Sequence, residues 1–142
     1  MVKLVWSNET QTTLQAIEGM LQEIGVSPFK ITSDNPKYFS LEASRFEPIL
    51  NPALERFASY YKIIVECLPP ADPQKKGKVE RMMPFVRRLY ECHGPERKGI
   101  EESQAYLDRK LAMANERIHG TTRLKPIDQL INIETAHLNT LP

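Results

Sequence analysis

The sequence predicts an α/β fold of about three strands with flanking helices. Short β-branched and aromatic segments at residues 2–6, 29–32 and 63–65 alternate with longer segments in which apolar residues recur every three or four positions. The chain has 142 residues, of which 41% are hydrophobic and 26% are charged, as in ordinary globular domains. It is therefore long enough to bury one core.

The first part of the chain is predicted to fold as strand, helix and strand. Residues 2–6 have the composition of a strand, and a helix is expected from Thr10 to a stop at Gly25. The apolar positions of this helix form one stripe: Leu14, Ile17, Leu21 and Ile24. Residues 29–32 are the next predicted strand, so these elements make a βαβ unit with a parallel pair of strands.

A second helix and a buried strand are predicted after a loop at residues 36–52. The helix covers residues 52–61, with Asn51 as its cap and a proline in its first turn. Its inward face consists of Leu54, Phe57, Ala58 and Tyr61. The strand covers residues 63–65, and a connection rich in proline leads onward from it.

The rest of the chain is predicted to be helical. One amphipathic helix is expected over residues 75–92, and Pro84 should kink or break it. A second amphipathic helix is expected over residues 100–116, with Leu107, Leu111 and Ala114 in phase. A turn and a short helix at residues 125–130 follow, and the tail from residue 132 is expected to be irregular.

Positive charge is concentrated in one stretch of the chain, although the net charge is only +1. Residues 1–73 carry 6 basic and 9 acidic side chains, residues 74–98 carry 8 and 3, and residues 99–142 carry 5 and 6, which gives −3, +5 and −1. The lysines that open the basic stretch are Lys75, Lys76 and Lys78. Such a run is typical of a solvated helix face, and it is also suited to contact the phosphates of DNA.

Two acidic residues have positions that permit a functional role. Asp34 follows the predicted strand at residues 29–32, at the kind of strand end where parallel sheets bind ligands; alternatively, Asp34 belongs to a simple turn. Glu80 lies among the lysines, and its alternative role is a weak ion pair with Lys76 one turn earlier in the helix. No nucleophile or partner acid is apparent for His119, so this residue is expected to support a turn rather than to catalyse.

Cys67 and Cys92 have neither the spacing of a zinc site nor a pattern that indicates a disulfide framework. No apolar run approaches the roughly 20 residues of a membrane span. These features predict a protein of the reducing cytoplasm with no membrane partner.

Taken together, the residues resemble the IstA-type transposases of bacterial insertion sequences, whose catalytic core is of the Asp-Asp-Glu integrase type with a ribonuclease-H-like fold. The motifs that carry the resemblance are Val5-Trp6-Ser7-Asn8-Glu9-Thr10-Gln11, Ser33-Asp34-Asn35, Lys75-Lys76-Gly77-Lys78-Val79-Glu80, and Asn115-Glu116-Arg117-Ile118-His119-Gly120-Thr121-Thr122 with Pro126. The resemblance covers residues 1–134 as a partial catalytic core and leaves residues 135–142 as a tail. It implies DNA transposition by polynucleotidyl transfer.

The resemblance also implies the site residues. Asp34 and Glu80 match the second and third catalytic acids, each of which holds one Mg²⁺ or Mn²⁺ ion. The residues implied to contact DNA are Lys75, Lys76, Lys78, Arg87 and Arg88. No residue matches the first Asp or the first two strands, so the resemblance implies a truncated ribonuclease-H-like fold, weak metal binding and no efficient strand transfer by this chain alone.

The implied partners are DNA at transposon ends and target sites, a second copy of the chain, and a helper ATPase of the IstB type. An alternative function is a non-catalytic DNA-binding or oligomerising remnant of a transposase. A ribonuclease-H-like nuclease of another purpose is a third possibility, which the pattern from Arg117 to Pro126 disfavours because that pattern resembles transposases.

Overall fold

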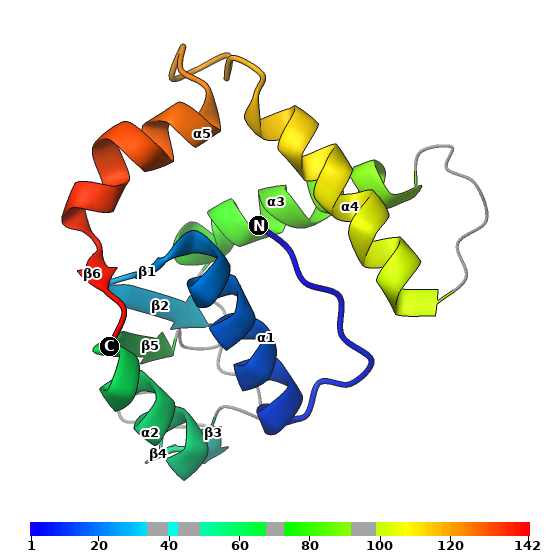
Figure 1. Ribbon diagram of the computed structural model, residues 1–142. Helices are drawn as coiled ribbons and strands as arrows, with labels where there is room; N and C mark the ends of the chain where they lie inside the picture. Colours follow the sequence, from blue (N-terminus) through cyan, green and yellow to red (C-terminus); the bar gives the residue numbers. More distant parts are fainter. Residues whose placement is uncertain (34–39, 43–48, 68–72, 92–98) are drawn as a thin grey trace. The chain divides into compact units, whose positions relative to one another are not determined.

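A computed structural model describes residues 1–33, 40–42, 49–67, 73–91 and 99–142, with the backbone alone for residues 40–42, 49, 67 and 73–80 (Figure 1). The chain divides into two compact units. The helical unit consists of Met1–Leu4 and Met82–Leu138, and the α/β unit consists of Val5–Arg81 and Asn139–Pro142. The predicted mixed α/β class is confirmed, with helix predominating.

The first helix, α1 (Thr10–Ile24), forms where the sequence predicts it. Gly25 ends the helix with a φ of 80°, and its N–H donates a 2.8 Å hydrogen bond to the Leu21 carbonyl. Glycine is favoured there because it adopts this left-handed conformation without a steric penalty. Leu14 and Leu21 of the predicted stripe are buried, whereas Ile24 is exposed, so the buried stripe ends one turn before the helix does.

The second helix, α2 (Pro52–Tyr61), also begins at the predicted residue. The Asn51 side chain accepts a 2.9 Å hydrogen bond from the Ala53 N–H, which satisfies one of the unpaired donors of the first turn. Three residues of the predicted inward face are buried, namely Leu54, Ala58 and Tyr61. Phe57 packs against the same core, which α1 and α2 share.

A parallel pair of strands lies in the α/β unit, between β2 (Lys30–Ser33) and β5 (Ile64–Cys67). Ile31 and Val65 are partly buried and pack against the core clusters, so this face of the pair covers the core. On the other face, Lys30 Nζ lies 2.8 Å from Glu66 Oε2, and Ile64 is 56% exposed. The expectation of a fully buried strand at residues 63–65 is therefore wrong for Ile64.

Residues 2–6 do not form the predicted strand. The Leu4 N–H donates a 2.7 Å hydrogen bond to Gln104 Oε1, and Gln104 Nε2 donates a 2.9 Å hydrogen bond to the Val2 carbonyl. Gln104 belongs to α4 (Gly99–Asn115). A helix side chain thus pairs with two of the backbone groups for which the prediction assumed a neighbouring strand.

The remaining strands form two short antiparallel pairs. β1 (Val26–Ser27) pairs with β6 (Asn139–Thr140), and β3 (Ser40–Glu42) pairs with β4 (Ile49–Leu50). Within the described residues the strands make three separate pairs rather than one sheet, and a ribonuclease-H-like fold is not present in them.

The expectation of an irregular tail from residue 132 is also wrong. The chain continues from α5 (Pro126–Gln129) through the turns η1 (Leu130–Glu134) and η2 (Thr135–His137) to β6. Asn139 Nδ2 donates a 3.1 Å hydrogen bond to the Lys62 carbonyl, which supports the end of the chain on the α/β unit.

The longest of the described helices is α3 (Pro73–Glu91), and Pro84 lies inside it without ending it. Its first part belongs to the α/β unit and its second part to the helical unit. In the helical unit, Leu107 and Leu111 of α4 are buried as predicted, whereas Ala114 is only half-buried; Tyr106, which was not predicted, is also buried. None of the helices in the described ranges has both the length and the apolar character needed to cross a membrane.

Candidate nucleic-acid interface

The parallel pair brings the carboxyl ends of two strands to one edge of the α/β unit. Ser33, the last residue of β2, is the register partner of Cys67, the last residue of β5. Asp34 follows Ser33 directly in the chain but lies outside the described residues. β5 leads through residues 68–72, also outside them, to α3. The two segments that carry the predicted acids therefore follow strands that end at the same edge.

The predicted helix around Glu80 is present, because residues 75–80 lie in the helical backbone of α3. The side chains of Lys75, Lys76, Lys78 and Glu80 lie outside the description. A metal-ligand role for Glu80 and its alternative, an ion pair with Lys76, both remain predictions. In the part of the chain that the structure describes, no group of three or more His, Cys, Asp or Glu side chains could hold a metal ion.

Arg87 and Arg88, the predicted continuation of the basic stretch, have different surroundings. Arg87 Nε lies 3.9 Å from Glu91 Oε1, one turn further along α3, and both side chains are largely exposed. Arg88 has no ion pair with any described residue and lines a pocket instead. Successive residues of an α-helix point about 100° apart, so the two guanidinium groups need not serve one ligand.

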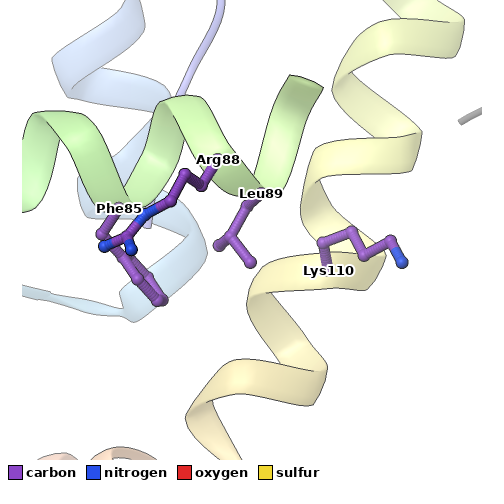
Figure 2. A pocket seen from close by; sticks show the side chains of 4 residues that line it. All are labelled: Phe85, Arg88, Leu89 and Lys110. Atoms are coloured by element: carbon purple, nitrogen blue, oxygen red, sulfur yellow. The ribbon is translucent and has the colours of Figure 1, made fainter. Parts of the chain in front are cut away.

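The pocket lies between α3 and α4 within the helical unit and has a volume of about 320 Å³ (Figure 2). Phe85, Arg88 and Leu89 line it from α3, and Lys110 lines it from α4. Figure 2 shows the Leu89 side chain directed toward α4 and the Lys110 ammonium directed away from the other three side chains. Lys110 Nζ lies 5.4 Å from the centroid of the Tyr106 ring, a cation–π distance.

Sequence reasoning missed this pocket. Leu89 fits the core stripe of α3, and Arg88 was predicted only as part of a basic track. The one local signal for Lys110 is its place four residues after Tyr106, since residues at this spacing contact each other on a helix. The pocket itself depends on the packing of α3 beside α4.

The turn after α4 supports the structural role predicted for His119. His119 Nδ1 accepts hydrogen bonds from the N–H groups of Thr121 at 3.3 Å and Thr122 at 3.5 Å. Across the same turn, Lys125 Nζ lies 3.0 Å from Glu116 Oε2, and this hydrogen bond raises the pKa of Lys125 above its ordinary value. His119 thus organises the turn through its ring nitrogen.

Comparison with known proteins gives no functional assignment for the chain. No protein-family model matches the chain, and no curated protein sequence matches it significantly. The motifs, the parallel pair and the basic helix are therefore the observations on which a functional assignment depends.

Proposed function

We propose that the chain carries part of a metal-dependent DNA strand-transferase core of the IstA transposase type. In this proposal Asp34 and Glu80 are two of the acids that bind Mg²⁺ or Mn²⁺. The DNA-contacting residues are Lys75, Lys76, Lys78, Arg87 and Arg88. The substrates are DNA at transposon ends and target sites, and the protein partners are a second copy and a helper ATPase.

The observation that carries the proposal is the common edge of β2 and β5. Ser33 and Cys67 end parallel neighbouring strands in register, Asp34 is the next residue after the first of them, and α3 with Glu80 follows the second. In sheets with parallel strands, ligands bind beyond the carboxyl ends of the strands. This connectivity suits two acids that serve one metal site, although they are 46 positions apart in the sequence.

The chemistry explains why acids and lysines would occur together. Phosphoryl transfer needs an activated oxygen nucleophile and a stabilised leaving oxygen, and two divalent ions supply both when they are bound. Carboxylates are the hard oxygen ligands that magnesium prefers. In this chain Asp34 and Glu80 would hold the ions, and the lysines of α3 would bind the phosphate backbone, which orients DNA without reading its sequence.

DNA binding by the lysines tests the proposal, because contacts to phosphates can be measured without a strand-transfer reaction. The variant K75Q/K76Q/K78Q should bind a DNA duplex more weakly in fluorescence anisotropy. Its slope of log affinity against log salt should fall by about 0.9 for each lost phosphate contact.

The matched control is the variant R109Q/R117Q/R123Q, which loses the same charge from side chains of the helical unit that are exposed. It should change the salt slope much less than the lysine variant does. Equal slopes for the two variants would mean that net charge alone determines binding, and an absence of duplex binding at low salt would refute the proposed function.

A further inference from the structure

We infer that the pocket between α3 and α4 binds an unpaired nucleotide, with the base against Phe85 and Leu89 and the phosphate on Arg88. The inference rests on the proposed function in one respect only, namely that the nucleotide belongs to a DNA strand. It concerns the helical unit and is independent of the metal site.

The size and lining of the pocket favour a small planar ligand. Its volume of about 320 Å³ is at the lower end of the range of ligand pockets, about 300–1,000 Å³. Phe85 and Leu89 are only partly buried, so each keeps apolar surface accessible to a ligand. The aliphatic part of Lys110 lies across from them on α4 (Figure 2).

The charges around the pocket favour an anionic group on that ligand. Among the described lining residues there is no acid, and the Arg88 guanidinium is the cation on the side of Phe85, because the Lys110 ammonium is directed away (Figure 2). Arg88 is exposed and has no ion pair with a described residue, whereas the neighbouring Arg87 already pairs with Glu91. A guanidinium group binds phosphate oxygens through two parallel hydrogen bonds, so Arg88 is suited to hold a phosphate at the rim.

Proteins that bind single-stranded nucleic acids combine aromatic rings with basic side chains, as Phe85 and Arg88 do here. Bases stack on aromatic side chains while cations follow the backbone, and this recognition tolerates any sequence because every base has a flat face. A base pair within a duplex does not offer that face, so the pocket should distinguish unpaired from paired nucleotides.

The test compares a blunt DNA duplex with the same duplex carrying a short single-stranded overhang, by fluorescence anisotropy with the full chain. The wild type should bind the overhang duplex about ten-fold more tightly than the blunt one. F85L keeps an apolar side chain but removes the stacking ring, and R88Q removes the phosphate contact. Both variants should lose most of the preference, whereas R109Q, which makes the same charge change at an exposed residue of α4 outside the proposed DNA contacts, should keep it.

Nuclear magnetic resonance titrations with a free mononucleotide and with an acidic aromatic peptide show whether the pocket binds a nucleotide or a peptide side chain. Shifts of the Phe85 and Leu89 signals with the mononucleotide and the overhang strand, and not with the peptide, are expected. Shifts with the peptide alone would overturn the inference.

The affinities separate this inference from the proposed function. Tight binding of the blunt duplex with no overhang preference, or a preference that F85L and R88Q retain, would overturn the nucleotide site and leave the proposed function standing. An absence of binding to either duplex would overturn both. Circular dichroism spectra should be the same for the three variants and the wild type, because none of the substituted side chains is fully buried.

Discussion

Replacing Gln104 by alanine should release the segment from Val2 to Leu4 from α4. The Gln104 side chain accepts a hydrogen bond from the Leu4 N–H at 2.7 Å, and its Nε2 donates to the Val2 carbonyl at 2.9 Å and to Asp108 Oδ1 at 2.7 Å. Each partly buried hydrogen bond stabilises the fold by about 1 kcal/mol, and the higher helix propensity of alanine returns a few tenths. The expected loss is about 2–3 kcal/mol in the free energy of unfolding.

Urea denaturation measures this loss, and hydrogen exchange at the Leu4 amide locates it. In Q104A, Leu4 should exchange markedly faster while Leu107 and Leu111 amides in the middle of α4 keep their protection. The matched control Q104E retains an acceptor for Leu4 and loses the donor to Val2, so its Leu4 amide should stay protected. An unchanged exchange rate of the Leu4 amide in Q104A would refute the hydrogen bonds between Gln104 and residues 2–4, and the strand predicted at residues 2–6 would then have to be reconsidered.

Three further substitutions test the α/β unit, each by chemical denaturation. G25A should cost about 1 kcal/mol, because the φ of 80° is unfavourable for alanine, while the added Cβ meets no atom of the described residues within 4 Å apart from its chain neighbours; an unchanged stability would contradict the left-handed cap. L54A should cost about 2–5 kcal/mol because Leu54 is 3% exposed, and a loss below 1 kcal/mol would mean that it is not in the core. The Tyr61 hydroxyl donates a 2.7 Å hydrogen bond to Glu18, which, together with burial, raises the pKa of Tyr61 to about 12. Because the unfolded tyrosine titrates near pH 10, the wild type should lose stability relative to Y61F as the pH rises from about 10 to 12, and parallel pH curves would contradict this.

The elements that the sequence predicted well are those defined by neighbouring residues. Gly25 ends α1, and Asn51 caps α2. Both signals act within one helical turn, so they can be read from a few consecutive residues. The apolar phases of α1, α2 and α4 are local in the same sense.

The elements that the sequence predicted poorly depend on distant parts of the chain. Residues 2–6 have a strand composition, but Gln104 takes the hydrogen bonds of the Leu4 N–H and the Val2 carbonyl. β6 exists because Val26 and Thr140 are register partners, a pairing across most of the chain that composition does not encode. Tertiary contacts decide such cases.

The same distinction applies to the candidate site. The helix around Glu80 was predicted from its apolar phase. A parallel pair of strands that includes β2 was also predicted, but its partner is β5 and not residues 2–6. The pocket at Arg88 was not predicted, because it requires α4 to lie beside α3. The sequence also did not indicate that Arg87 pairs with Glu91 while the adjacent Arg88 lines a pocket.

The most direct test of the proposed function is a titration with Mn²⁺ followed by nuclear magnetic resonance, since this paramagnetic ion broadens the signals of nearby amides. One ion should broaden the amides around Asp34 and those around Glu80 at the same Mn²⁺ concentration, and both D34N and E80Q should abolish the broadening at both places. Broadening at neither place, or at one place independently of the other acid, would contradict a shared metal site and with it the assignment to a strand-transferase core.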